Sequence, residues 1–358
     1  MIKGEYKVIG VMSGTSLDGI DLAYISFKKD SNWQFKILNA ETVSYSENWV
    51  KNLKNLTGLP TIELDNIDTD YTQYLAKIIN QFIDKHNITN IDAVCSHGHT
   101  ALHQPALGFT KQIGNLPQLS TLIKQTVICD FRVQDVLFGG QGAPLVPIGD
   151  QLLFSNYDWC LNLGGFANIS SEVDNNRIAF DICPVNIVLN KYVEKLGLSF
   201  DNKGQLARSG TLNVQLYNQL NALAFYDETP PKSLGLEWVE KHVLPLINSF
   251  NLSTEDSLHT FVKHIAFQIA KIINQTSKAS VLATGGGVFN SYLIEEIEQL
   301  TTNQIIIPSN RIIEFKEALI FGFLGVLKLR DENNCLKSVT GAIKDHSSGK
   351  IFSFNTSQ

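Results

Sequence analysis

The feature that most constrains the fold is a glycine-rich turn that follows an apolar run near the start of each half of the chain. In the first half, Val8 to Val11 leads into Met12 to Asp21, and a second apolar run follows. In the second half, Trp159 to Leu163 leads into Gly164-Gly165, and again an apolar run follows. Short apolar runs bounded by turn residues are typical of strands. Each half is therefore predicted to begin with a β-hairpin.

Both halves then continue with alternating strand and helix patterns. In the first half, Ile62 to Lys85 has apolar residues at helical spacing, and Ile91 to Cys95 is strand-like. In the second half, Thr254 to Gln275 is a predicted helix, Ser280 to Thr284 a strand and Lys316 to Arg330 an apolar helix. This alternation is typical of α/β proteins. We expect two similar α/β lobes, residues 1–155 and 156–315, with the segment after about 316 joining the first lobe, and a ligand between them.

Charge and cysteine content narrow the function classes. The chain has 29 Lys and Arg against 35 Asp and Glu, a net charge of −6, which disfavours binding to nucleic acid or anionic membrane. The longest apolar run, Ala318 to Leu327, is too short to span a membrane, and we expect no secretory signal. The five cysteines include no C-x-x-C pair. They are predicted to be buried thiols of a cytoplasmic protein, with a catalytic role for Cys183 as the alternative.

The turn of the first hairpin carries two glycines, two hydroxyl side chains and two carboxylates. Glycine lets the backbone approach a ligand closely, Thr and Ser can donate to phosphate, and carboxylates can hold Mg²⁺. An ordinary hairpin turn is the alternative, because Gly, Ser and Asp are common in turns. The candidate phosphate-binding residues are Gly14, Thr15, Ser16, Leu17, Asp18, Gly19, Ile20 and Asp21, with Asp18 as the candidate Mg²⁺ ligand.

Two further glycine turns occur in the second half. One is Gly164-Gly165, and the other is Gly285-Gly286-Gly287, which follows an apolar strand and precedes Asn290. Three consecutive glycines cost backbone entropy, and a helix that begins there favours an anion or a nucleotide. Each could be an ordinary turn, but their matching places in two halves favour a shared nucleotide site.

Histidine and arginine residues supply candidate polar contacts. His97, His99 and His103 could be a metal site, polar substrate contacts or structural histidines. Arg132 lies between Asp130 and Asp135, so a local ion-pair network is the alternative to a ligand contact.

Asp181 stands at the end of an apolar strand, just before a predicted helix that Asn186 could cap. Catalytic groups of α/β proteins are often found there. Desolvation would raise the pKa of Asp181 towards that of a general base. The alternative is a local turn or cap residue.

Taken in order, these clusters resemble the anhydro-N-acetylmuramic acid kinase family, from about residue 8 to about residue 342. The matching segments are GVMSGTSLDGID, SHGHT, His103-Gln104-Pro105, IGN at 113–115, DFRVQD, GGQGAPLVP, LNLGGFAN, TGGGVFN, KEAL at 316–319 and Val339-Thr340-Gly341. MSGTSLDGID and GGQGAPLVP are long enough to make chance agreement negligible.

The resemblance implies a two-lobed actin/hexokinase-like, ribonuclease H-like fold with a central nucleotide cleft. It implies that ATP and Mg²⁺ are used to open 1,6-anhydro-N-acetylmuramic acid with water and to form N-acetylmuramic acid 6-phosphate during peptidoglycan recycling. Asp181 would be the base. The three glycine turns and Asn290 would bind the nucleotide, and the residues implied for sugar or phosphoryl contacts are His97, His103, Arg132, Asn186 and Glu317. The expected partners are the sugar and ATP, with a homodimer as one form of assembly.

The sequence departs from the family pattern beside Asp181. Cys183 and Val185 stand where the pattern usually has glycines, and we expect their side chains to narrow the approach of the backbone to the sugar. Two other functions are retained as alternatives: a metal-dependent hydrolase that uses the three histidines, and a non-catalytic sugar-binding sensor.

Overall fold

The computed structural model describes residues 2–14 and 17–354. The chain divides into two compact units. Unit 1 comprises Met1–Leu153 and Phe315–Gln358, and unit 2 comprises Phe154–Glu314. Unit 1 is therefore built from both ends of the chain, whereas unit 2 is continuous.

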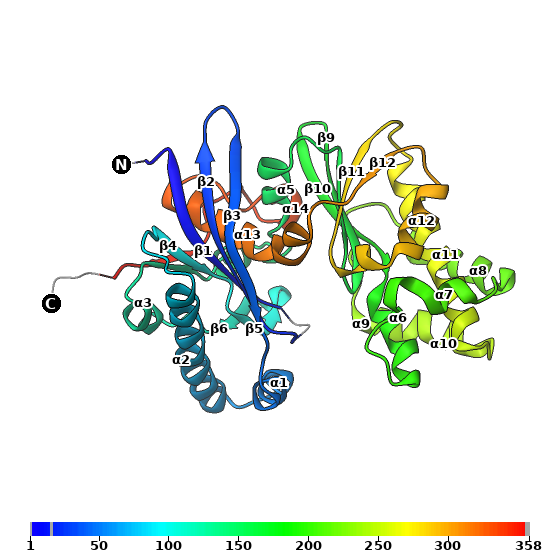
Figure 1. Ribbon diagram of the computed structural model, residues 1–358, viewed down its shortest axis with the longest axis horizontal. Helices are drawn as coiled ribbons and strands as arrows, with labels where there is room; N and C mark the ends of the chain where they lie inside the picture. Colours follow the sequence, from blue (N-terminus) through cyan, green and yellow to red (C-terminus); the bar gives the residue numbers. More distant parts are fainter. Residues whose placement is uncertain (1, 15–16, 355–358) are drawn as a thin grey trace. The chain divides into compact units, whose positions relative to one another are not determined.

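Unit 1 contains a six-stranded sheet in the order β13-β7-β4-β1-β2-β3. Figure 1 labels its strands β4, β1, β2 and β3. The first three strands of the chain are antiparallel to one another, whereas β4 pairs parallel with β1 and β7 pairs parallel with β4. A separate hairpin, β5-β6, completes its strands. The strand bounds are β1 Glu5–Ser13, β2 Ile20–Lys29, β3 Trp33–Val43, β4 Ala93–Ser96, β5 His99–Gln104, β6 Phe109–Ile113, β7 Val127–Cys129 and β13 Lys350–Phe352.

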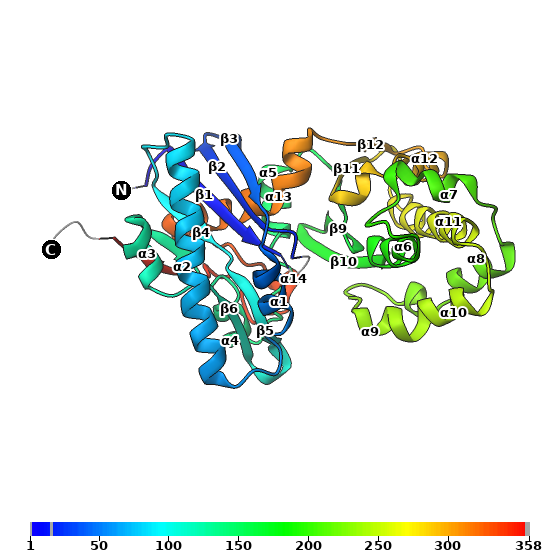
Figure 2. The ribbon, with the colours of Figure 1, turned by 60° about the horizontal axis from the view of Figure 1, so that its bottom comes forward.

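Helices cover both faces of this sheet. Alternate residues of a strand point to opposite faces, and Ile9 and Val11 of β1 pack in one core with buried residues of α2, which lies along the sheet in Figure 2. On the other face, Gly10 lies against the backbone of α13. The helices of unit 1 are α1 Glu47–Lys54, α2 Thr61–Lys85, α3 Gln118–Ile123, α4 Val133–Leu137, α5 Pro147–Leu153 and α14 Lys337–Thr340, together with α13 Asn310–Leu329, which begins in unit 2.

Unit 2 contains a five-stranded sheet in the order β10-β9-β8-β11-β12. Its first three strands are antiparallel, and β11 and β12 continue the sheet in parallel from β8. The strand bounds are β8 Trp159–Leu163, β9 Phe166–Val173, β10 Asn176–Pro184, β11 Ser280–Thr284 and β12 Gln304–Ile306. The helix bounds are α6 Asn186–Val193, α7 Gln205–Ser209, α8 Val214–Asn221, α9 Leu236–Trp238, α10 Leu244–Ser249, α11 Thr254–Ile273 and α12 Ser291–Gln299.

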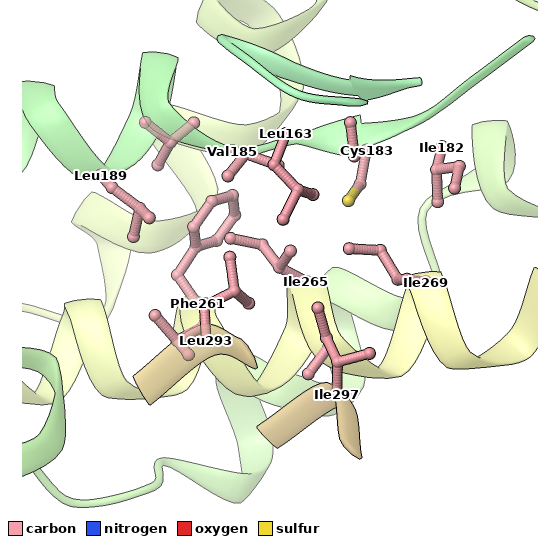
Figure 3. Close-up of a cluster of buried hydrophobic side chains, with 14 of the residues drawn as sticks. Leu163, Ile182, Cys183, Val185, Leu189, Phe261, Ile265, Ile269, Leu293 and Ile297 are labelled. Carbon is pink, nitrogen blue, oxygen red and sulfur yellow. The ribbon is translucent and has the colours of Figure 1, made fainter. Parts of the chain in front are cut away.

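The core of unit 2 forms around α11. Phe261, Ile265 and Ile269 recur every four residues, so they share one face of the helix. Figure 3 shows this face against Leu163 and Cys183 of the sheet. The repeated spacing of large apolar residues therefore fixes which side of α11 faces the sheet.

The two sheets share one strand order. In each unit, the third, second and first strands are followed by two parallel strands, and unit 1 adds β13 at the edge. This is the ribonuclease H-like order, so the predicted α/β fold class is confirmed. The β5-β6 hairpin and the helices α7 to α10 are not among the predicted elements.

Candidate functional site

The first glycine turn lies between β1 and β2. Packing alone accounts for some of its residues, whether or not the turn also binds a ligand. Ile20 is fully buried in the core, and a side chain at Gly19 would collide with the carbonyl oxygen of Val43. Asp18 is exposed, and Asp21 accepts a hydrogen bond from the hydroxyl of Thr42 at 2.5 Å. Leu17 has a positive φ of 62°, and its N–H lies 3.4 Å from the carbonyl oxygen of Gly14. Two of the candidates, Thr15 and Ser16, lie outside the described residues.

A buried polar chain begins at the end of β1. The hydroxyl of Ser13 lies 2.9 Å from Nδ1 of His99 and 2.6 Å from the hydroxyl of Tyr45, which lies 2.6 Å from that of Tyr71. Burial lowers the pKa of His99 to about 4, so its ring is neutral near pH 7. Ser13, Tyr45 and Tyr71 are not among the residues predicted from the sequence. Ser13 could have been found because it belongs to the MSGTSLDGID motif, whereas nothing in the sequence connects the two tyrosines to it.

His97 and Arg132 form a direct contact. Nε of Arg132 donates to Nε2 of His97 at 2.8 Å, and Nδ1 of His97 lies 2.8 Å from the carbonyl oxygen of Gly98. Because a carbonyl only accepts, Nδ1 carries the proton and the ring is neutral. Burial, aided by the charge of Arg132, holds the pKa of His97 well below its usual range.

Arg132 also reaches the glycine-rich loop that follows α4. Its Nη1 donates to the carbonyl oxygen of Gly142 at 2.7 Å. The alternative of a local ion-pair network is not supported, because Asp130 pairs with Lys350 at 2.9 Å and Asp135 accepts from the N–H of Gly142 at 2.7 Å. Arg132 therefore joins the loop of His97 to the loop of Gly142.

Glu317 lies within reach of the charge of Arg132. Desolvation by the surrounding protein raises the pKa of Glu317, and the positive charge of Arg132 lowers it. The Glu317 side chain is nevertheless exposed at the surface. The neighbouring Lys316 forms a buried ion pair with Asp150 at 2.8 Å, which anchors this part of α13. Unit 1 thus brings together His97, Arg132 and Glu317.

The three histidines do not form a metal site. His97 and His99 are committed to the contacts above, and Nδ1 of the exposed His103 lies 3.1 Å from the hydroxyl of Thr110. Across residues 2–14 and 17–354, three metal-ligand side chains come together only elsewhere in unit 1, at Asp135, Cys335 and His346. The structure therefore does not favour the alternative of a metal-dependent hydrolase built on His97, His99 and His103.

In unit 2, Asp181 lies on β10 at an irregularity. Asp181 pairs with Asn168 and Cys183 pairs with Ala167, so Ile182 is an extra residue in this strand. The Asp181 carboxylate accepts from the N–H of Leu234 at 2.8 Å. Burial raises the pKa of Asp181, and the hydrogen bond from Leu234 opposes this effect. The half-buried carboxylate therefore has the elevated proton affinity expected of a general base.

The bulge also explains where the two departures from the family pattern lie. Cys183 and Val185 are fully buried and point into the core of unit 2 beside Ile265 and Phe261 (Figure 3). The structure does not support the expectation that they narrow the approach to the sugar, because both side chains are buried in the core. All five cysteines are buried free thiols, as predicted. Burial raises the pKa of Cys183, which disfavours its catalytic role.

The Gly164-Gly165 turn holds the start of α6. The carbonyl oxygen of Gly165 accepts from the N–H groups of Val185 and Ile187, and that of Gly164 accepts from Asn186. Asn186 is the first residue of α6 and not its side-chain cap, contrary to the prediction. Its Nδ2 instead lies 3.5 Å from the carbonyl oxygen of Leu163.

The three consecutive glycines differ in what they do. Gly285 has φ of 83°, and a Cβ there would lie 2.6 Å from Oδ1 of Asn162, while one at Gly287 would lie 2.7 Å from the side chain of Leu163. A Cβ at Gly286 would contact nothing within 4 Å, so open space lies beside it. Asn290 caps α12, as its Oδ1 accepts from the N–H of Leu293 at 3.0 Å.

In the part of the chain that the structure describes, no helix combines the length and the apolar character that a bilayer crossing requires.

Comparison with known proteins identifies the family. The sequence matches the family described as anhydro-N-acetylmuramic acid kinase over residues 6–354. It is 32% identical to the anhydro-N-acetylmuramic acid kinase of Shewanella denitrificans, covering 96% of this chain and 97% of that one. It is 33% identical to that of Pasteurella multocida, covering 96% of each chain, and 30% identical to that of Haemophilus influenzae, covering 98% of each chain. This agreement over nearly the whole length shows that the chain belongs to the anhydro-N-acetylmuramic acid kinase family.

Proposed function

We propose that this protein uses ATP to convert 1,6-anhydro-N-acetylmuramic acid and water into N-acetylmuramic acid 6-phosphate and ADP, as a step in peptidoglycan recycling. Its family membership makes it an ATP-dependent phosphotransferase. The observation that carries the full reaction is the half-buried Asp181, whose raised pKa suits a base, in a chain that otherwise keeps the family motifs.

In the proposed reaction, Asp181 takes one proton from a water molecule. The water oxygen bonds to the anomeric carbon C1, and the bond between C1 and O6 breaks. O6 then bonds to the γ-phosphorus of ATP, and the bond from that phosphorus to the leaving ADP breaks. The N–H of Leu234 holds one oxygen of Asp181, which fixes the carboxylate for this step.

The nucleotide is proposed to lie against the glycine turns. Gly286 supports this placement, because neither its backbone angle nor neighbouring atoms require glycine there. A residue without a side chain beside open space lets a ligand approach the backbone. The residues proposed to contact ATP are Gly14 to Asp21, Gly164, Gly165, Gly285, Gly286, Gly287 and Asn290.

Mg²⁺ is proposed to accompany ATP, with Asp18 as a ligand. Mg²⁺ keeps several of its waters when bound, and the exposed Asp18 carboxylate fits such a hydrated ion. When bound, the ion would neutralise charge on the phosphates.

Contacts to the sugar or the transferred phosphoryl group are proposed for His97, His103, Arg132, Asn186 and Glu317. Arg132 supports this proposal, because its Nη2 takes part neither in the contact with His97 nor in the contact with Gly142. Both ring nitrogens of His97 are engaged, so His97 would act by holding Arg132 in place. We also propose a cytoplasmic location, where ATP is available and five free thiols stay reduced, and a homodimer, which light scattering would test.

The direct test is ADP release measured with and without 1,6-anhydro-N-acetylmuramic acid. ADP formation that depends on the sugar, with N-acetylmuramic acid 6-phosphate as product, is expected. Sugar binding without ADP release would instead indicate the sensor, and product without ATP would indicate a hydrolase. Family membership favours neither of these alternatives.

A further inference from the structure

Three side chains that the proposed reaction does not use meet inside unit 1. They are Asp135 on α4 and Cys335 and His346, which flank α14. Their exposed fractions are 0%, 2% and 4%, and one ligand atom of each lies within 4.8 Å of the other two. Within the described residues, this is the one group of three or more such side chains so close together. The cluster is therefore a closed interior site and not part of a surface.

The ring of His346 points a nitrogen lone pair into this cluster. Its Nδ1 lies 3.1 Å from the carbonyl oxygen of Lys344, which can only accept, so Nδ1 carries the proton of the neutral ring. Nε2 is buried and has no hydrogen-bond partner among the described residues. Its distance to Oδ1 of Asp135 is 3.6 Å, which is too long for a hydrogen bond. Two buried electron-pair donors that face each other in this way fit a cation between them.

The separation of His346 from Asp135 and the three ligand types both fit zinc. In tetrahedral coordination, nitrogen and oxygen ligands about 2.0–2.2 Å from the ion stand about 3.4 Å from each other. The observed 3.6 Å between His346 and Asp135 is close to that separation. A carboxylate, an imidazole and a thiolate are the three side-chain types that zinc prefers in proteins.

The surroundings hold the carboxylate in place. Oδ1 of Asp135 accepts from the hydroxyl of Thr340 at 2.7 Å, and Oδ2 accepts from the N–H of Gly142 at 2.7 Å. Such outer hydrogen bonds orient metal ligands and leave lone pairs for the ion. They also give a physical role to Thr340 of the Val339-Thr340-Gly341 motif.

We propose that Asp135, Cys335 and His346 bind one Zn²⁺ ion. The ion joins α4 to the C-terminal segment, and through Asp135 and Gly142 it supports the loop that Arg132 also contacts. Its role is structural, since the site is closed.

The test uses tag-free, full-length protein without nucleotide, stripped of metal by a chelator under reducing conditions and titrated with Co²⁺. We expect one Co²⁺ per chain and a thiolate-to-cobalt charge-transfer band that Zn²⁺ abolishes. Cys335→Ser removes the band and His346→Gln weakens binding. Cys95→Ser, which alters another fully buried thiol of unit 1, keeps both the band and the stoichiometry.

A folded wild-type chain that shows no such band, or a band that survives in Cys335→Ser, would overturn the proposal. If Cys335→Ser does not fold, His346→Gln and the metal content of the purified wild type decide the question. Less than a tenth of an equivalent of zinc in freshly purified protein, together with no Co²⁺ band, would refute the site.

Discussion

At the scale of single residues, the proposed reaction depends on Asp181. Asp181→Asn keeps the shape of the side chain and an acceptor for the N–H of Leu234, but the amide cannot take a proton from water. We expect turnover to fall by about 10²–10⁴-fold, the usual loss of a general base. Steady-state ADP release measures this, with circular dichroism to verify folding.

The control for Asp181→Asn is ligand binding. Calorimetry should find sugar and ATP affinities within a few-fold of wild type, because the change removes only a proton acceptor. In ¹⁸O-labelled water, wild type should place the label on C1 of the product. Near-normal turnover by Asp181→Asn would remove this residue from the mechanism, and label in the phosphate would mean that water attacks ATP.

The pH dependence of the reaction follows from the same residue. Burial raises the pKa of Asp181 above the ordinary 3.8, and a base must be ionised to act. The value of kcat/KM should therefore decline as pH falls through a pKa higher than that of a free aspartate. A pH–rate profile from pH 4 to 8 measures it, and a profile that stays flat down to pH 4 contradicts the assignment.

Asp18 can be tested separately from Asp181. Asp18→Asn retains the size of an exposed turn residue but loses the negative charge that favours Mg²⁺. We expect weaker Mg²⁺ dependence of turnover without loss of fold. If titrations with Mg²⁺ at fixed ATP give wild-type curves, Asp18 has no part in metal or phosphate binding.

At the scale of elements, the turn between β11 and α12 contains one glycine that packing requires and another that packing does not require. Gly285→Ala forces a side chain into backbone with φ of 83° and against Asn162, which should cost about 1–3 kcal/mol in the free energy of unfolding. Gly286→Ala meets no atom within 4 Å, so its stability should match wild type while KM for ATP rises. Denaturation and kinetics on both variants provide the comparison, and equal ATP kinetics in Gly286→Ala and wild type would remove this turn from the nucleotide site.

Helix α11 carries a buried histidine that makes unit 2 sensitive to acid. Nε2 of His264 lies 2.9 Å from the hydroxyl of Tyr226, Nδ1 lies 2.7 Å from Oδ1 of Asn221, and burial lowers the pKa of His264 to about 3. The folded state therefore excludes a proton that the unfolded state binds below about pH 6.5. Above about pH 6.5, His264 is neutral in both states and does not reduce the free energy of unfolding. As the pH falls from there towards 3, the free energy of unfolding decreases by about 1.4 kcal/mol per pH unit.

Hydrogen exchange of α11 peptides at pH 7 and 5, corrected for intrinsic rates, measures this loss. His264→Gln should reduce the difference between the two pH values, whereas His242→Gln, at an exposed position of the same unit, should preserve it. An unchanged difference in His264→Gln would assign the acid sensitivity to other groups.

At the scale of the whole molecule, the hairpin that occurs in each half could be predicted, because it depends on a local pattern of apolar runs and glycine turns. Apolar runs and glycine turns at 8–27 and 159–173 are enough to indicate a hairpin in each half, and the structure confirms the shared strand order. The β5-β6 hairpin lacks that pattern, since His103 and Gln104 are exposed polar residues. The register of the hairpin is set by the pairing of β5 with β6, and the sequence of neither strand reveals that pairing.

Residues of the candidate site could be predicted only where a chemically suitable side chain also stands in a recognisable sequence pattern. His97 and Arg132, selected separately from the sequence, contact each other across 35 positions. The error at Cys183 and Val185 has a physical cause, because an extra residue in β10 turns adjacent side chains towards the core. Strict alternation from Asp181 predicts the opposite, because the bulge becomes visible only once β10 is paired with β9.

Unit 1 depends on contact between the two ends of the chain. A Cβ at Gly10 of β1 would overlap the carbonyl oxygen of Ala318 in α13, a backbone atom that cannot move without shifting the helix. Gly10→Ala should therefore destabilise unit 1 by about 1–3 kcal/mol or more. Gly4→Ala, just before the same strand, meets nothing within 4 Å and is the matched control.

Because the two units need not unfold together, hydrogen exchange resolved by peptide is the measurement. Peptides from residues 2–14, 17–153 and 315–354 should lose protection in Gly10→Ala, while those from 154–314 keep it. Equal loss in both units would mean that they form one cooperative body, and no loss in either would mean that β1 and α13 lie further apart than the structure places them.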